Sequence, residues 1–268
     1  MEILSLPELK KIEFDLLKYF DAFCQKHNIK YFLSNGTLLG AVKYKGFIPW
    51  DDDIDVFVPR EDYDRLISLF EDDSKFQLVS FERVPSYLFP FAKLCDRTTL
   101  KEEVGFDNGV ELGVNMDIFP LDMWENDINA AKKEAKRIQR NIFYLTMAKL
   151  KKADSKNALK RIIKRLIMFY SKFIGGKHFV KSIDKASRKI KTEKSNYVGC
   201  KAWCIYGDRE IVPTHVFDSV VDVEFEGGVF PAPIGYDFYL KSLYGDYKKD
   251  PPLEKQKTHH GYTAYSIL

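Results

Sequence analysis

The stretch that most constrains the fold is residues 31–59, YFLSNGTLLGAVKYKGFIPWDDDIDVFVP, because acidic and apolar residues alternate near its end. Side chains alternate between the two faces of a strand, so Asp51, Asp53 and Asp55 share one face. The opposite face carries apolar side chains that predict contact with a core: Ile54, Val56 and Val58. A solvated acidic loop is the alternative, but such loops are rarely followed directly by Ile-Asp-Val-Phe-Val.

The residues before these acids predict a strand, a turn and a helix. Residues 31–33 are an apolar run typical of a strand, Ser34-Asn35-Gly36 predict a tight turn, and Thr37 begins a helical segment. A glycine-containing turn at the start of a helix suits a phosphate group, although Gly36 alone is equally typical of an ordinary turn. Carboxylates two residues apart on a rigid strand repel one another, and Mg²⁺ suits such oxygen clusters. The stretch therefore predicts a metal-dependent site for phosphate transfer.

Residues 36–56, GTLLGAVKYKGFIPWDDDIDV, resemble the signature of the LicD family, the phosphocholine transferases of bacterial surface polysaccharides, to which fukutin is related. The resemblance implies a nucleotidyltransferase fold. It assigns phosphate binding to Gly36 and Thr37, and two acids on the next strand to Asp53 and Asp55.

The chain departs from the family pattern at two places. Asn35 stands where a second glycine is usual, and Lys43-Tyr44 stand where Arg-His is usual. Lys43 keeps the positive charge, but a lysine cannot make the bidentate phosphate contact of an arginine.

A lysine and a third acid follow from later segments. Lys93 ends an apolar run, and the resemblance makes it a candidate phosphate contact; a solvated lysine at a strand end is an equally good interpretation. Residues 114–122, VNMDIFPLD, resemble the family's "DIFPLD" segment, which assigns the third acid of the site to Asp117. Asp122 is expected to cap the following helix, with a swap of these two roles as the alternative.

The remaining patterns predict an α+β fold, a nucleotidyltransferase-like mixed sheet flanked by helices. Helical periodicity predicts helices over 5–27, 60–70, 126–150, 157–174 and 178–191, and apolar runs predict strands over 76–81 and 88–94. We divide the chain into a catalytic core (1–125), a basic helical region (126–195) and an aromatic-rich C-terminal region that completes the site (196–268). In this last region "FEG", "YGDY", "PP" and His259-His260 also resemble the family.

Charge is unevenly distributed along the chain. Residues 131–194 hold 21 Lys/Arg and 4 Asp/Glu, a balance of +17, which indicates an anionic partner. Within them, residues 157–174 predict a basic amphipathic helix. We expect its apolar stripe to pack on its own domain, with an anionic membrane surface as the alternative partner.

The sequence also bears on the compartment. The four cysteines are too few and scattered for a disulfide framework, and buried thiols are a better interpretation than a zinc site. No run of 18 uncharged apolar residues and no signal peptide are visible. These features predict a cytoplasmic protein, with peripheral contact at the inner face of the membrane left open. Nucleic acid is not an expected partner.

The family resemblance implies the reaction. Asp53, Asp55 and Asp117 would hold one or two Mg²⁺ ions, and Asp117 could also take a proton from the acceptor hydroxyl. The donor would be CDP-choline or another CDP-alcohol such as CDP-ribitol, and CMP would leave. Phosphocholine would pass to a sugar hydroxyl of a glycan or lipid-linked glycan, such as a polysaccharide or teichoic acid precursor. Trp50, beside the acids, could hold the choline cation, although core packing is the favoured role for any single aromatic residue.

Two other functions remain open. A nucleotidyltransferase that moves NMP from an NTP to a small acceptor would use the same metal site. A non-catalytic protein that binds a membrane or a polysaccharide would explain the basic region but not the three acids.

Overall fold

The computed structural model describes residues 1–190, 195–258 and 261–267, so His259-His260 lie outside the described residues. The strands are β1 (Glu2–Ile3), β2 (Phe32–Leu33), β3 (Asp55–Pro59), β4 (Phe76–Val79), β5 (Ala92–Asp96), β6 (Thr99–Glu103), β7 (Asn115–Met123), β8 (Tyr197–Gly199), β9 (Val212–Pro213), β10 (Val220–Phe225), β11 (Gly228–Pro233) and β12 (Tyr262–Ser266). The α-helices are α1 (Leu6–His27), α2 (Asn35–Tyr44), α3 (Arg60–Leu69), α4 (Ile128–Lys149), α5 (Ala158–Ile174), α6 (Gly176–Ser187) and α7 (Tyr236–Tyr244). Short 3₁₀ turns are η2 (Gly207–Glu210), η3 (Thr214–Phe217) and η4 (Leu253–Lys255).

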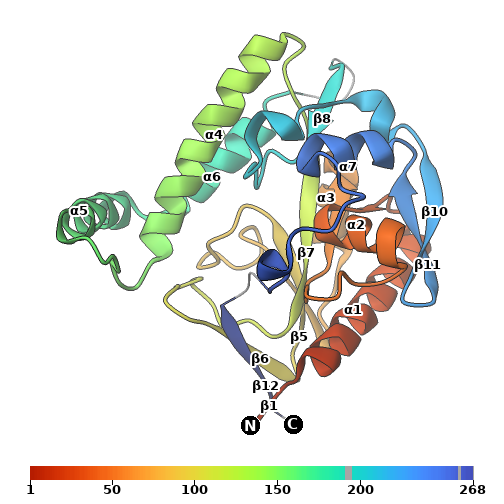
Figure 1. Cartoon of the computed structure of the whole chain (residues 1–268), viewed down its shortest axis with the longest axis horizontal. Helices are drawn as coiled ribbons and strands as arrows, with labels where there is room; N and C mark the ends of the chain where they lie inside the picture. The colour runs from red at the N-terminus through yellow and green to blue at the C-terminus, as the bar shows by residue number, and fades with distance from the viewer. Residues whose placement is uncertain (191–194, 259–260, 268) are drawn as a thin grey trace.

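A mixed sheet of order β2-β3-β7-β5-β4 forms the centre of the molecule, and β8 and β9 extend it beside the far end of β7. Strands β3 and β7 are parallel, whereas β5 pairs with β7 in the antiparallel sense. Helices surround this sheet, and β1 and β12 bring the two chain ends together at one edge of the molecule (Figure 1). The predicted α+β class is confirmed.

Helix α1 begins and ends where its sequence predicts. Ser5 precedes it, and the Glu8 carboxylate accepts a hydrogen bond from the Ser5 amide at 2.7 Å. Such a capping box satisfies donors that the first helical turn leaves unpaired. Asn28 ends the helix in the left-handed conformation (φ 51°). Its buried side chains, including Leu16 and Phe20, belong to the main core, and α1 packs against β5 and β7.

Asp122 does not cap a helix, and that expectation is wrong. It lies inside β7, where its carboxylate accepts two hydrogen bonds from the Arg60 guanidinium, at 2.7 and 2.8 Å. Asp127 caps α4 instead, accepting hydrogen bonds from the amides of Asn129 and Ala130. Strand β7 simply runs further than the sequence suggests, because its end pairs with β8. The Arg60–Asp122 pair joins the start of α3 to the central sheet.

Helices α4, α5 and α6 stand to one side of the sheet, with α5 furthest out (Figure 1). The expectation that α5 buries its apolar stripe on its own domain is wrong, because most of that stripe faces solvent. Only Met168 and Ser171 of α5 are buried. Among the described residues, no helix has both the length and the apolar character needed to cross a bilayer. All four cysteines are free and buried, as predicted.

Candidate active site

The acids of the 51–55 stretch line a cleft of about 1130 Å³. Asp51, Asp53 and Asp55 enter it from the loop and strand that follow α2, and Asp117 enters it from β7. Asp52 lies in the loop before β3, does not line this cleft, and accepts a hydrogen bond from the Tyr262 hydroxyl at 2.8 Å. The cleft is therefore lined by Asp51, Asp53 and Asp55, whereas Asp52 is hydrogen-bonded to Tyr262 of β12.

Strand register places three charged residues in one row across the sheet. Asp55 of β3 is paired directly with Asp117 of β7, and Asp117 is paired with Lys93 of β5. Directly paired residues have neighbouring side chains on the same face. The next inward-facing row is aromatic: Phe57 pairs with Phe119, whose ring centroid lies 4.4 Å from that of Phe91. The charged row thus lies next to a row of aromatic side chains on the same face of the sheet.

Burial and repulsion from the neighbouring acids both affect the pKa of Asp55. Burial raises the pKa of Asp55 well above its usual range, and the charges of Asp53, Asp117 and Asp51 raise it further. A carboxyl in this position is ionised readily only when a positive group joins the cluster. The site is therefore built to attract positive charge.

Lys93 supplies one such charge. Lys93 is 5% exposed, and its ammonium group forms an ion pair with the Asp117 carboxylate. Burial acts to lower the pKa of Lys93, but the attraction of Asp117 outweighs it and the pKa lies above the usual value. The Asn115 amide donates to the same Asp117 oxygen at 2.9 Å. Lys93 is therefore not a solvated strand-end lysine; the structure places it inside the acidic cluster.

The start of α2 faces the cleft through Gly36. A Cβ atom on Gly36 would lie 2.8 Å from the Asp51 carboxylate, so any side chain there would displace that acid. Helix N-termini present unpaired N–H groups that suit anions. The Ser34 hydroxyl, just before the helix, is buried and has no hydrogen-bond partner among the described residues. Thr37 is buried, and its hydroxyl accepts a hydrogen bond from the Asp55 amide at 2.8 Å, which braces β3 against α2.

The donor set fits a divalent cation in its chemistry. Asp53, Asp55 and Asp117 offer hard oxygen ligands, and burial together with the neighbouring acids raises the pKa of Asp55, so a cation would favour its ionised form. Within the described residues, no group of three or more His, Cys, Asp or Glu side chains is arranged as a metal site. The structure thus brings the three predicted acids to one cleft but does not show them as a coordination shell.

A second recess, of about 420 Å³, adjoins the cleft. The two share three residues, Asp53, Asp117 and Trp203. Lys93, Lys101 and Lys149 line the recess together with the acids Asp53, Glu103 and Asp117. Burial lowers the pKa of Lys149 to about 7, and its ammonium nitrogen lies 3.0 Å from the centroid of the Phe89 ring. Two recesses, the smaller of which carries three lysines, therefore meet at Asp53 and Asp117.

Aromatic side chains line the outer part of the cleft. Trp50 is half-buried, and its ring meets that of Tyr44 edge to face at 6.4 Å. Tyr206 and Tyr244 form a second edge-to-face pair at 5.7 Å. The sequence named Trp50 individually and the C-terminal tyrosines only as a group; Tyr206 and Tyr244 are the ones that the fold brings to the cleft.

Glu13 of α1 is a further residue that the sequence analysis missed. Its carboxylate is fully buried and has no hydrogen-bond partner among the described residues. Burial raises its pKa well above the usual range; Lys101 opposes this effect, and the charges of Asp53 and Asp117 add to it. An acid on the otherwise apolar stripe of a helix was the available signal.

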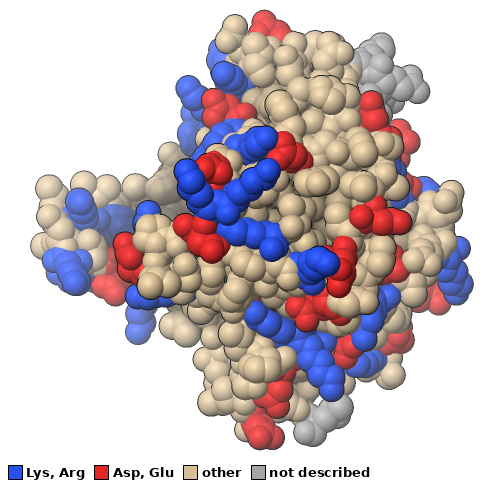
Figure 2. Space-filling model, turned by 45° about the vertical axis from the view of Figure 1, so that its right-hand side comes forward, with Lys and Arg blue, Asp and Glu red and all other residues tan. Residues whose placement is uncertain are grey.

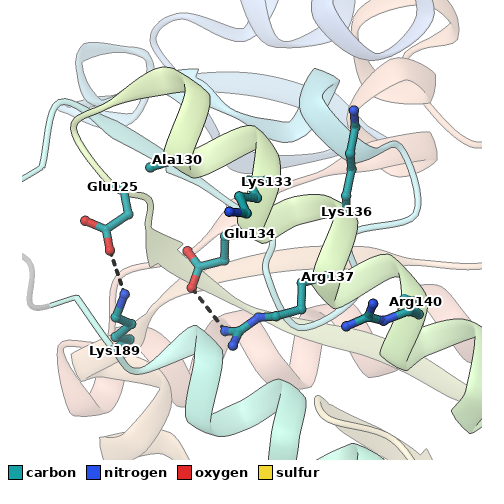
Figure 3. A pocket seen from close by; sticks show the side chains of 8 residues that line it. All are labelled: Glu125, Ala130, Lys133, Glu134, Lys136, Arg137, Arg140 and Lys189. Atoms are coloured by element: carbon teal, nitrogen blue, oxygen red, sulfur yellow. Dashed lines mark hydrogen bonds and ion pairs between the residues drawn. The ribbon is translucent and has the colours of Figure 1, made fainter.

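A separate basic pocket lies on α4, away from the acids. It has a volume of about 510 Å³ and is lined by Lys133, Lys136, Arg137 and Arg140, among others. Figure 3 shows Lys189 paired with Glu125, and Arg137 paired with Glu134, at 2.8 and 3.7 Å. No acid cluster or aromatic wall accompanies these side chains in the described part of the pocket, so we do not place chemistry there.

Comparison with known proteins gives a family model and a full-length relative that agree with each other. The family model "LicD/FKTN/FKRP, nucleotidyltransferase domain" matches residues 28–144, which include α2, β3 and β7. The lipopolysaccharide cholinephosphotransferase LicD of Haemophilus influenzae is 33% identical over 275 aligned residues, which cover 100% of both chains. Uncharacterized proteins of Rickettsia prowazekii and Rickettsia typhi are 48% identical over 59 residues, which are 22% of this chain and 20% and 17% of theirs.

Proposed function

The chain belongs to the LicD family, and we propose that it is a transferase that moves phosphocholine from CDP-choline to a sugar hydroxyl of a cell-surface polysaccharide or teichoic acid precursor. The similarity to a cholinephosphotransferase along the whole chain supports the transferred group. The observation that carries the proposal is the meeting of two recesses at Asp53 and Asp117, because a group transfer needs two substrates that meet at one point.

We assign the donor to the larger cleft and the acceptor to the adjoining recess that carries three lysines. The N-terminus of α2 at Gly36 suits the donor pyrophosphate, and the aromatic wall that includes Trp50 suits a trimethylammonium group. In the recess, Lys101 and Lys149 suit a polar acceptor that carries phosphate or several hydroxyls. CDP-ribitol or another CDP-alcohol would fit the same donor cleft, so the choline specificity rests on the relative.

In the reaction, an acceptor hydroxyl attacks the phosphorus that bears choline. The bond from that phosphorus to the bridging oxygen breaks, and CMP leaves with the electron pair. Asp117 takes the acceptor proton, and Lys93 and Asn115 hold its carboxylate toward the cluster. One or two Mg²⁺ ions, held by Asp53, Asp55 and Asp117, would offset negative charge on the transferring phosphoryl group.

Localisation forms part of the same proposal. We infer a cytoplasmic enzyme that works peripherally at the inner face of the membrane, where a lipid-linked glycan acceptor would be presented.

Double labelling of the donor tests the reaction class. Incubation with Mg²⁺, a glycan acceptor and CDP-choline should transfer a choline label to the acceptor and release the cytidine label as CMP. Cytidine label on the acceptor would contradict the proposal, and pyrophosphate release from an NTP would favour the nucleotidyltransferase alternative.

Two variants tie that turnover to the cleft. Asp53→Asn keeps the size of the side chain but removes a charge, so turnover should fall by orders of magnitude while metal-free thermal stability stays level or rises. The control, Asp222→Asn on β10, removes a charge from an exposed strand and should leave turnover unchanged. Near-normal turnover of the Asp53→Asn enzyme would overturn the assignment.

A further inference from the structure

Helix α5 presents its apolar side chains to solvent. Eight of them are between 36% and 81% exposed: Leu159, Ile162, Ile163, Leu166, Phe169, Tyr170, Phe173 and Ile174. They recur at helical spacing and therefore form one continuous face. Globular proteins rarely expose an apolar patch of this size unless something covers it.

The position of α5 leaves this face accessible. The helix lies at the periphery, beyond the end of α4 and away from the central sheet (Figure 1). Among the described elements it packs mainly against α4 and α6, and its buried residues are Met168 and Ser171. The apolar face points away from that packed side, because residues 166, 169, 170 and 173 lie roughly opposite 164 and 171 at about 100° per residue.

The charge of the helix limits what can cover the face. Helix α5 contains five Lys/Arg and no Asp/Glu. Arg161, Arg165 and Lys172 lie together along one flank of the apolar face, and the protrusion at the left of Figure 2 shows blue basic side chains beside uncharged surface. Two copies packed face to face would bring these positive charges together, which disfavours self-association.

We propose that α5 docks in the plane of an anionic lipid bilayer, with its apolar face in the headgroup–acyl boundary and its basic flank on lipid phosphates. Such a surface offers both an apolar layer and negative charge, and amphipathic basic helices bind it for these two reasons. The inference stands independently of the transferred group. If the proposed reaction holds, the same contact keeps the enzyme beside membrane-borne acceptors.

Vesicle co-sedimentation of the full chain tests this docking. The protein should sediment with vesicles of phosphatidylcholine and phosphatidylglycerol, less so at high salt, and not with phosphatidylcholine alone. Equal binding to both vesicle types, or binding to neither, would overturn the proposal. Lipid-free dimerisation that disappears when the face is altered would show that a second copy covers it instead.

Matched variants separate the apolar and basic contributions. Phe169→Ser with Phe173→Ser alters rings that are 74% and 81% exposed, so unfolding should change little while vesicle binding is lost. The control pair Val104→Ser and Val229→Ser, 76% and 63% exposed elsewhere, should bind as the unaltered chain does.

The charge arm reverses Arg161 and Arg165 to Glu. At about fivefold per basic residue near an anionic surface, removal of the two should weaken partition by roughly 25-fold or more. Reversal of the exposed Lys11 and Lys26 of α1 is the matched control and should have much less effect. Equal losses in the two pairs would mean that net charge, not α5, drives binding, and would overturn the assignment.

Discussion

Asp117 and Lys93 together set the charge of the acidic cluster. Lys93 compensates Asp117 directly, whereas Asp55 forms no ion pair with any described residue and has a raised pKa. The acids themselves could be predicted from strand alternation and from the family resemblance. The Lys93–Asp117 pair could not, because the two residues are 24 positions apart and meet only through the register of β5 and β7.

Trp50 offers a test of how the choline group is recognised. Its ring lines the cleft and is supported by Tyr44. Trp50→Ala should reduce kcat/KM for CDP-choline more than for CDP-ribitol, whose ribitol group carries no cation. The difference should correspond to about 0.5–2 kcal/mol, because a cation–π contact is lost only with choline. Trp50→Phe, which keeps an aromatic face, should show a smaller reduction of kcat/KM for CDP-choline. Equal reductions for both donors in the Ala variant would assign Trp50 to packing alone.

At the scale of elements, helix limits were predictable wherever a cap marks them. Ser5 and Asn28 delimit α1 as expected, since caps are local in sequence. Strand limits were less predictable than helix limits. The apolar run predicts a strand over 88–94, whereas β5 runs Ala92–Asp96 and so ends two residues later. The strand extends because Cys95 pairs with both Gln77 and Asn115, which local sequence does not reveal.

Helix α5 shows a second limit on what local sequence can predict. Its periodicity correctly predicted an apolar face and a basic one. Periodicity does not say what covers the apolar face, and the structure leaves that face to solvent. Whether a stripe belongs to a core is decided by the neighbouring elements, which for α5 are mainly α4 and α6 in the described part of the chain.

The Arg60–Asp122 pair gives a prediction at this scale, because it joins α3 to β7. Both side chains are largely buried, at 14% and 2% exposed. Asp122→Asn should lower the free energy of unfolding by at most about 3–5 kcal/mol in urea titration, since it removes the charge of the hydrogen-bonded partner and leaves the guanidinium only the more distant Asp64 and Asp184, at 4.0 and 3.9 Å. Asp15→Asn, which breaks the exposed pair with Lys18, should cost less than about 1 kcal/mol. Similar losses for the two would mean that the buried pair is not a structural joint.

At the scale of the whole molecule, the candidate site is assembled from distant parts of the chain. The acids come from the N-terminal half, whereas Tyr206 and Tyr244 close the cleft from the C-terminal region. Composition predicted that this region is aromatic, but not which rings reach the cleft. The turn η2 decides this for Tyr206, whose amide donates a hydrogen bond to the Glu210 carboxyl at 2.8 Å.

Glu210 therefore links the stability of the molecule to pH. Burial raises the pKa of Glu210 from 4.5 to about 8, although the bond from Tyr206 and the charge of Arg209 oppose this. Between these two pH values the unfolded chain loses the proton and the folded chain keeps it. The contribution to stability is thus fully present below about pH 4.5 and falls as pH rises to about 8, by at most about 5 kcal/mol.

The Glu210→Gln variant isolates this effect, because glutamine keeps the acceptor oxygen and the shape but does not titrate. The variant should match the unaltered protein near pH 4.5 and become progressively more stable relative to it up to pH 8, after which the difference should level off. Urea unfolding of both proteins across this range measures the difference while other titrating groups cancel. A difference that stays constant with pH, or that grows toward acid, would mean that Glu210 is ionised in the folded protein and that the η2 turn is held as a charged acceptor.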